Sequence, residues 1–239
     1  MNVEALWHDL ECGSYGDDLP LWRALASEAD GPVLDVGAGT GRVTLDLAAA
    51  GAEMIALDSC APLLEALACR ADGLAVETVV ADAREFTLRR RVSLVLVPMQ
   101  TLQLFGGPAG RAAFLHRALA HLQPGGLLAA ALADAMDCFD EEHDQPPLPD
   151  ERVVLGVCYA SRLLDVVDDG GRAALHRRRE ISGPGRRREA RDVIVRLDRV
   201  GADEVAAEGR QVGFRSEPHR FIAESERYLG STVVILRAP

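Results

Sequence analysis

The stretch Val33-Leu34-Asp35-Val36-Gly37-Ala38-Gly39-Thr40-Gly41-Arg42 decides the fold. Its apolar beginning predicts a buried strand over residues 32–36, and the apolar residues that follow Gly41 recur at the spacing of a helix. Glycines let the backbone turn sharply after the strand, and they let a ligand lie directly against peptide groups. In parallel sheets, ligands bind outside the carboxyl ends of the strands. The stretch therefore predicts an α/β fold with a ligand site at residues 37–41.

Strands and helices alternate along the chain up to residue 133. Apolar runs predict strands at residues 53–57, 74–80, 92–97 and 127–133, and amphipathic runs predict helices at residues 17–29, 61–71 and 108–122. The sequence Gln123–Gly126 predicts the turn between the last of these helices and the last of these strands. Such alternation is typical of a parallel sheet that helices cover on both faces.

The pattern changes after Asp134. Turn residues at 168–171 and 182–185 divide residues 152–197 into three or four β-type runs, which predicts an antiparallel meander. A helix at 202–212 and two strands at 215–222 and 232–237 are expected to close the chain. We therefore expect one domain over residues 1–239, of the α/β class, with a doubly wound, seven-stranded, mostly parallel sheet and helices on both faces. Residues 1–30 would form a helical lid, and residues 135–200 an inserted antiparallel β cap.

Composition excludes several classes of protein. The formal net charge of −11, from 26 basic and 37 acidic residues, means that a nucleic-acid partner is not expected. No apolar run is long enough to cross a membrane, and residues 1–10 lack the basic start and apolar core of a signal peptide. The five cysteines are scattered and never spaced as CxxC. We expect a cytoplasmic protein that neither holds a metal ion nor contacts a membrane.

The spacing of the glycines separates two kinds of ligand. Dinucleotide-binding turns read G-x-G-x-x-G, with a glycine at the last place for close helix packing. Here the pattern is G-x-G-x-G, and Arg42 occupies that last place. Asp35, two residues before the first glycine, adds a carboxylate that is able to face an amino group. This favours a ligand with a cationic amino-acid end over one with a diphosphate.

Two further acids fall at strand ends. Asp58 ends the second predicted strand, where a carboxylate is able to accept hydrogen bonds from both hydroxyls of a ribose. Asp82 follows the third predicted strand and is able to accept a hydrogen bond from an adenine amino group. A helix N-cap before Ala61 is an alternative role for Asp58, and both roles can hold together. Acids at three successive strand ends indicate a nucleoside ligand.

Five motifs in chain order resemble those of the class I methyltransferases, which bind S-adenosylmethionine (SAM), and the resemblance covers residues 15–133. The motifs are Tyr15–Asp18, Leu34–Gly41, Ala56–Ser59, Ala81–Phe86 and Leu122–Gly126. The resemblance implies SAM as cofactor and S-adenosylhomocysteine as product. The cofactor-binding residues that it implies are Tyr15, Asp35, Gly37, Ala38, Gly39, Asp58, Ser59, Asp82, Ala83 and Pro98. Of these, Asp35, Gly37 and Gly39 would lie near the methionine moiety, Asp58 at the ribose, and Asp82 with Ala83 at the adenine.

Methyl transfer from a sulfonium is an in-line displacement with a good leaving group, so the protein mainly aligns the acceptor. A general base is needed only for an acceptor that arrives protonated. The candidates for a catalytic role are Tyr15, which the resemblance places near the sulfonium, Gln100, which follows the fourth strand, and His143, in an acidic loop. A solvated lid is favoured over a metal site at His143, because no ligand spacing repeats around it.

The resemblance places the methyl acceptor at Val97–Gln100, which carries neither the motif of DNA-amino methyltransferases nor the acid of metal-assisted members. We therefore expect transfer to an N or O atom of a small molecule. One alternative is an RNA or protein methyltransferase that uses the arginine-rich hairpin at residues 176–191. If hairpin residues whose numbers add to 367 face each other, opposite charges pair as Glu180–Arg187 and Arg178–Glu189. The basic face would then comprise Arg177, Arg179, Arg186 and Arg188, although a merely solvated hairpin is the favoured interpretation.

Two other classes stay open. One is an NAD(P)-dependent oxidoreductase, against which Arg42 argues. The other is a protein that binds the cofactor without turnover.

Overall fold

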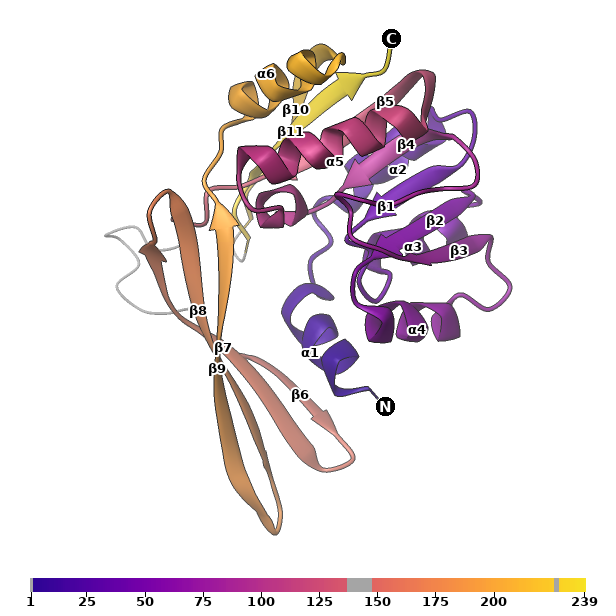
Figure 1. The fold of residues 1–239 in the computed structure, drawn as a ribbon. Helices are drawn as coiled ribbons and strands as arrows, with labels where there is room; N and C mark the ends of the chain where they lie inside the picture. The colour runs from indigo at the N-terminus through magenta and orange to yellow at the C-terminus, as the bar shows by residue number, and fades with distance from the viewer. Residues whose placement is uncertain (1, 137–147, 226–227) are drawn as a thin grey trace.

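The computed structural model describes residues 2–136, 148–225 and 228–239, and it contains two β-sheets (Figure 1). The strands of the larger sheet are β1 (Val33–Val36), β2 (Met54–Asp58), β3 (Val76–Val80), β4 (Val92–Val97), β5 (Leu122–Leu132), β10 (Arg215–Ile222) and β11 (Ser231–Arg237). The strands of the smaller sheet, which we call the cap sheet, are β6 (Asp150–Val154), β7 (Val157–Asp168), β8 (Arg172–Gly183) and β9 (Arg186–Asp198). The helices are α1 (Val3–Cys12), α2 (Leu19–Ser27), α3 (Arg42–Ala49), α4 (Ala61–Arg70), α5 (Pro108–His121) and α6 (Ala202–Val212), and a 3-10 helix, η1, spans Thr101–Leu104.

The larger sheet has the order β10-β11-β5-β4-β1-β2-β3 among the described residues. Strands β1 to β5 are parallel, and β11 runs antiparallel to both of its neighbours, β5 and β10. The strand order reverses between β1 and β4, and that is where open α/β sheets bind their ligands. The predicted fold class is therefore confirmed, including the seven-stranded, mostly parallel sheet and the inserted antiparallel cap.

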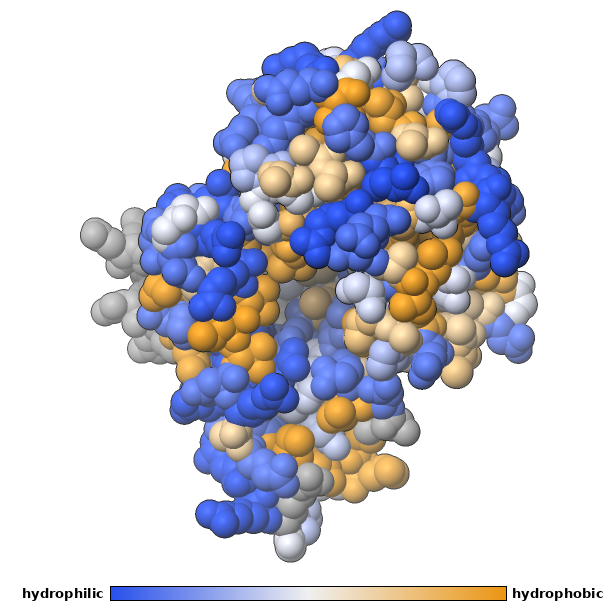
Figure 2. Space-filling model, in the orientation of Figure 1, coloured by the Kyte–Doolittle hydropathy of each residue, from blue (hydrophilic) through white to orange (hydrophobic). Residues whose placement is uncertain are grey.

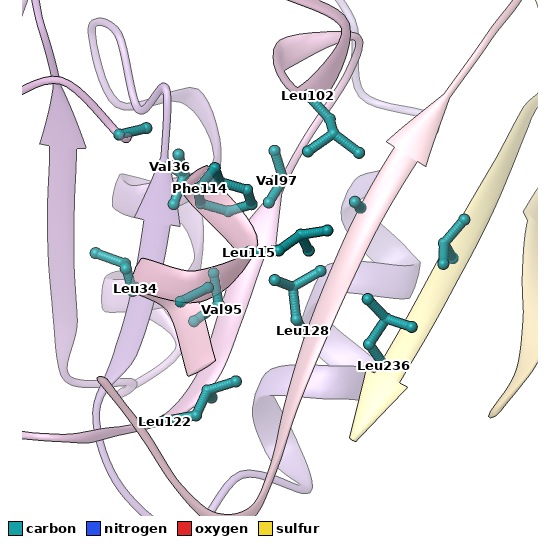
Figure 3. Packing of buried hydrophobic residues seen from close by; sticks show 14 of the residues in the cluster. Leu34, Val36, Val95, Val97, Leu102, Phe114, Leu115, Leu122, Leu128 and Leu236 are labelled. Carbon is teal, nitrogen blue, oxygen red and sulfur yellow. The ribbon is translucent and has the colours of Figure 1, made fainter. Parts of the chain in front are cut away.

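Two apolar layers hold helices on opposite faces of this sheet. On one face, Leu34 and Val36 of β1 pack with Phe114 and Leu115 of α5 (Figure 3). On the other face, Val33 packs with residues of α2 and α3, among them the fully buried Trp22. Burying one such aromatic or aliphatic side chain contributes about 1.5–3 kcal/mol. Because side chains alternate along a strand, Asp35 points to the same face as Val33, toward α3.

Strand β5 begins earlier than predicted. It starts at Leu122, directly after α5, whereas the sequence predicts a turn over residues 123–126 and a strand from residue 127. The pairing with β4 jumps from Val92–Leu122 to Leu94–Leu127, so the four intervening residues form an irregularity within the strand. Gly125, with φ of +74°, allows this bend.

The cap sheet has the predicted turns but not the predicted register. Strands β7, β8 and β9 meet at the turns expected from the sequence, and β6 joins β7 through a turn at Leu155–Gly156 that was not expected. In the β8–β9 hairpin, paired residues have numbers that add to 370 over most of its length, and the loop is Pro184-Gly185. Arg178 therefore faces Asp192, and Glu180 faces Ala190, so the predicted register is wrong.

None of the helices in the described residues combines the length and apolar character required to cross a membrane.

Candidate functional site

The glycine turn after β1 is held in place by the neighbouring strand. The amides of Gly37 and Ala38 donate to the carbonyl oxygen of Leu57, at 2.8 and 3.0 Å. Gly37 and Gly39 have φ of +73° and +56°, which disfavours any side chain. A Cβ atom on Gly37 would lie 2.6 Å from Thr101, and one on Gly39 would lie 2.2 Å from the His8 ring. The turn therefore needs glycine for its conformation and for the close approach of two side chains.

Asp58 ties the carboxyl end of β2 to this turn. Its Oδ2 atom accepts a hydrogen bond from the Gly39 amide at 2.9 Å, and its Oδ1 atom accepts one from the Cys60 amide at 2.8 Å. The N-cap residue of α4 is Cys60, so the alternative of Asp58 as N-cap is wrong. Each carboxylate oxygen keeps a further lone pair for a ligand.

Asp35 is enclosed beside the turn, with 1% of its surface exposed. Its Oδ2 atom accepts a hydrogen bond from the Thr44 hydroxyl at 2.7 Å, whereas its buried Oδ1 atom has no hydrogen-bond partner among the residues that the structure describes. Burial raises the pKa of Asp35 to about 6, although the Thr44 hydroxyl and the charge of Arg42 oppose that shift. A buried oxygen without a partner is the kind of atom that a cationic ligand group satisfies.

Asp82 lies at the same edge of the sheet. The Ala81 amide donates to the Asp58 carbonyl oxygen at 3.1 Å, so the two strand ends are adjacent. The Asp82 side chain accepts hydrogen bonds from the backbone and the guanidinium of Arg84, and this pairing lowers the pKa of Asp82. Of the residues that follow the two acids, Ser59 is exposed and Ala83 is buried. The structure thus brings the three acids predicted from the sequence to successive strand ends.

Tyr15 packs against Arg42, the residue that follows the glycine turn. The guanidinium of Arg42 lies 5.1 Å from the centre of the Tyr15 ring, and the Tyr228 ring meets it edge-on at 4.8 Å. Burial raises the pKa of Tyr15 to about 12, so its hydroxyl stays protonated at neutral pH. Arg42 also binds Asp18, which lies just before α2. Arg42, where a dinucleotide-binding turn would have glycine, therefore anchors the N-terminal segment.

Helix α1 supplies a site residue that sequence reasoning missed. The His8 ring covers Gly39, and its Nδ1 atom lies 3.2 Å from the Thr40 hydroxyl. Burial lowers the pKa of His8, although the nearby carboxylates of Asp58, Asp9 and Glu11 oppose the shift. One signal could have found the helix: Asn2 caps it by accepting a hydrogen bond from the Glu4 amide.

The carboxyl end of β4 carries the remaining candidates. Pro98 is buried, Gln100 is half-buried, and Met99 between them has φ of +55°, which is rare for a residue with a side chain. Gln103, in η1, is buried, and its amide nitrogen donates to the carbonyl oxygens of Ala133 and Asp198, both at 3.0 Å. Gln103 therefore joins the two crossings between the larger sheet and the cap sheet. His143 lies outside the described residues.

The predicted basic face on the cap hairpin does not form. Arg177 and Arg179 point toward α1, where Arg179 binds Glu11 at 2.7 Å, whereas Arg188 lies on the other face and binds Glu180 at 2.6 Å. The difference of three between the predicted and observed pair sums moves one strand's side chains to the opposite face. Arg177 and Arg179 therefore do not share a face with Arg188, as the predicted basic face required.

The molecular surface is hollowed between the larger sheet and the cap sheet (Figure 2). A separate cavity of about 400 Å³ lies between α1 and α4, lined in part by Asp9, Glu65 and Arg70. None of residues 37–41 lines that cavity, so it is distinct from the glycine turn.

Comparison with known proteins identifies a domain in this chain. Residues 33–126, from β1 to the irregular start of β5, match the family model described as "Methyltransferase domain". This chain carries a methyltransferase domain. It is also 32% identical to the cypemycin N-terminal methyltransferase of Streptomyces sp over 161 residues. That alignment covers 67% of this chain and 63% of the relative, so the chain spans less than two thirds of the curated protein that it matches.

Solved methyltransferases share the whole architecture. An amino pentose methyltransferase from Micromonospora echinaspora, solved with SAM bound, has a TM-score of 0.75 at 19% identity, with 100% of this chain and 98% of that chain covered. The CcbJ methyltransferase from Streptomyces caelestis has a TM-score of 0.72 at 20% identity, with 95% and 98% covered. These likenesses confirm the predicted class I methyltransferase fold. With the methyltransferase domain, they remove the basis for assigning the glycine turn to an NAD(P)-dependent oxidoreductase.

Proposed function

We propose that this protein transfers a methyl group from SAM to a nitrogen atom of a small molecule. The observation that carries the proposal is the hydrogen bond from the Gly39 amide to Asp58, which sets an acid at the end of β2 against the glycine turn. Asp35 and Asp82 flank it on the neighbouring strand ends. A methyltransferase domain over residues 33–126 contains all three acids.

The residues at the turn fit the cofactor. The Oδ1 atom of Asp35, which has no partner in the described part of the chain, would accept a hydrogen bond from the ammonium of the methionine moiety, beside the peptide groups of residues 37–39. Asp58 and Ser59 would hold the ribose. Asp82 and Ala83 would hold the adenine, and Tyr15 and Pro98 would border the reacting end. Bound SAM supplies a methyl group on a sulfonium, which leaves S-adenosylhomocysteine after transfer.

The described candidates for catalysis support a positioning role. Tyr15 is protonated at neutral pH because burial raises its pKa to about 12, so it would act through its hydroxyl dipole rather than as a base. Gln100 carries no titratable group, and it would orient the acceptor by hydrogen bonds at the end of β4. Alignment of this kind lowers the barrier by fixing the reactants in a near-attack geometry. His143 stays a candidate from the sequence alone.

A nitrogen acceptor is supported by what related proteins are named for. The curated relative is an N-terminal methyltransferase. Among the solved structures are a sugar N-methyltransferase from Streptoalloteichus sp and an N1-methyltransferase of Burkholderia thailandensis that acts on 1,6-didemethyltoxoflavin. We propose an amine or ring nitrogen of a metabolite or short peptide for this chain as well. A nucleic-acid substrate is not proposed, since Arg177, Arg179 and Arg188 of the cap hairpin each pair with an acid.

Calorimetric titration tests this function directly. We expect the wild-type protein to bind SAM and S-adenosylhomocysteine, and Asp58→Ala to weaken binding at least tenfold. The control is Asp72→Ala, which removes an exposed acid after α4 and should leave binding unchanged. A wild-type protein that binds neither compound, or an Asp58→Ala variant that binds as well as wild type, would contradict the proposal.

A further inference from the structure

His8 is held over the glycine turn from both sides of α1. On one side, Asp9 binds Arg70 of α4, with the closest nitrogen and oxygen atoms 2.6 Å apart. On the other side, Glu11 accepts hydrogen bonds from the Ser161 hydroxyl and from the Nε and Nη2 atoms of Arg179, at 2.7–2.8 Å. Helix α1 therefore bridges α4 and the cap sheet (Figure 1), and the position of the imidazole between these anchors is fixed.

The hydrogen bonds of Thr40 determine which nitrogen of His8 carries the proton. The Thr40 hydroxyl donates to Asp9 at 2.6 Å, so its oxygen is left to accept from His8 Nδ1 at 3.2 Å. A hydroxyl has one proton to donate, and a neutral imidazole has one donor and one acceptor nitrogen. His8 Nδ1 is therefore the donor, and Nε2 is left with a lone pair.

That lone pair lies at the proposed cofactor site. The Nε2 atom is the ring atom nearest to the position that a Cβ on Gly39 would take, and the Gly39 amide in turn binds Asp58. Of the two ring nitrogens of His8, Nδ1 alone has a hydrogen-bond partner within the described residues. The glycine turn thus presents two acceptors beside each other, one imidazole nitrogen and one carboxylate.

We propose that His8 is a cofactor-binding residue whose Nε2 atom accepts a hydrogen bond from one ribose hydroxyl, beside Asp58. The inference rests on the proposed binding of SAM and adds a residue from α1 to it. A diol next to a carboxylate has two donors to place, and both Asp58 oxygens already accept one backbone hydrogen bond each. With a second acceptor from α1, one hydroxyl donates to Asp58 and the other to His8. The docking of α1 is thereby linked to cofactor binding.

The experiment compares three His8 variants with a matched control. In His8→Gln the amide oxygen is able to reach the place of Nε2, in His8→Asn it reaches only that of Nδ1, and His8→Ala has no acceptor. His116→Ala removes an exposed histidine of α5 and serves as the control. By titration with S-adenosylhomocysteine, we expect His8→Ala and His8→Asn to lose about three- to tenfold in affinity, the usual range for one neutral hydrogen bond. His8→Gln and His116→Ala should bind as wild type does.

Deoxy derivatives identify the donor on the cofactor. With the 2′-deoxy or 3′-deoxy form of S-adenosylhomocysteine that lacks the bonded hydroxyl, wild type and His8→Ala should bind equally, since no hydrogen bond remains to be lost. The inference would be overturned if His8→Ala bound both deoxy forms more weakly than wild type does, by the same factor. It would also be overturned if His8→Ala and wild type bound S-adenosylhomocysteine equally well. A His8→Gln variant as weak as His8→Ala would contradict it as well. Failure of the wild-type protein to bind S-adenosylhomocysteine would instead overturn the proposed function.

Discussion

Arg42 binds Asp18 through two nitrogen–oxygen contacts of 2.6 and 2.7 Å, and Asp18 is fully buried. Arg42 is the first residue of α3, directly after the glycine turn, and Asp18 is the residue before α2. The indole nitrogen of Trp22 donates to the same carboxylate at 2.7 Å. The Arg42–Asp18 pair therefore anchors the N-terminal segment, including Tyr15, to the start of α3.

Removing this arginine should destabilise the protein strongly. Arg42→Ala leaves the buried Asp18 carboxylate with the Trp22 indole as its donor among the described residues. Breaking a buried ion pair from one side costs about 3–5 kcal/mol. We expect a loss of this size in the free energy of unfolding, measured by urea titration. Arg23→Ala is the control, because the Arg23–Asp46 pair lies at the surface and should contribute little. Equal effects of the two substitutions would contradict the role given to Arg42.

Asp35 should make the stability of the ligand-free protein depend on pH. Its pKa rises from 3.8 to about 6 on folding, so the folded state binds more protons than the unfolded state between these values. The favourable contribution is complete below pH 3.8 and is lost as the pH rises through about 6, with a total of about 3 kcal/mol. Asp35→Asn should remove this dependence. Unfolding free energies of both proteins at pH 4, 5, 6 and 7 check it, and a constant difference between them would contradict it.

Gln103 should control how firmly the cap sheet is attached. Gln103→Ala leaves the Ala133 amide and two carbonyl oxygens without their side-chain partner, at a cost of about 1–3 kcal/mol for the buried groups. We expect faster hydrogen exchange at the Ala133 amide and lower overall stability. Gln100→Ala, three residues earlier and half-buried, is the control and should leave exchange at Ala133 unchanged. The same exchange rate in Gln103→Ala as in wild type would show that the amide does not hold the crossings.

Glu11 should determine whether α1 stays docked. Its carboxylate is 13% exposed, and hydrogen bonds from Arg179 and Ser161 lower its pKa against the opposing effect of burial. Since the pKa is depressed on folding, the stabilisation is present above pH 4.5 and is lost as the pH falls through the folded value. Glu11→Ala should speed amide exchange throughout α1, whereas Glu4→Ala, an exposed acid on the same helix, should not. Unchanged exchange in Glu11→Ala would contradict the bridging role of this residue.

The sequence predicts the larger sheet and the three acids because their signals are local. Buried strands show as short apolar runs, and an acid that ends a strand reaches the same edge as its neighbours once the strands are parallel. The residues of the glycine turn were therefore predicted to lie together with Asp58 and Asp82, and the structure places them at adjacent strand ends. A resemblance to a known family strengthened this prediction with Tyr15 and Pro98.

The features that the sequence did not predict depend on contacts between distant segments. The placement of His8 over Gly39 depends on ion pairs of α1 with α4 and with the cap sheet, and no local pattern encodes them. In the sequence, Gln103 looks like any polar loop residue, because its partners Ala133 and Asp198 are distant in the chain. The predicted hairpin register is wrong because a bulge and a loop shifted by one residue moved the β9 arginines to the opposite face relative to those of β8.

The place where the cap sheet joins the larger sheet bears on how a protein of this architecture changes its acceptor. The chain leaves the larger sheet at Ala133 and comes back at Asp198, and Gln103 holds both places together. Both ends of the insertion therefore lie beside Gln103. A differently shaped insertion grafted between the same two residues would keep these two ends, but it would remove Ser161 and Arg179, which bind Glu11 of α1. A chimaera made to exchange substrate preference therefore has to supply a new anchor for α1, because α1 carries His8 over the glycine turn.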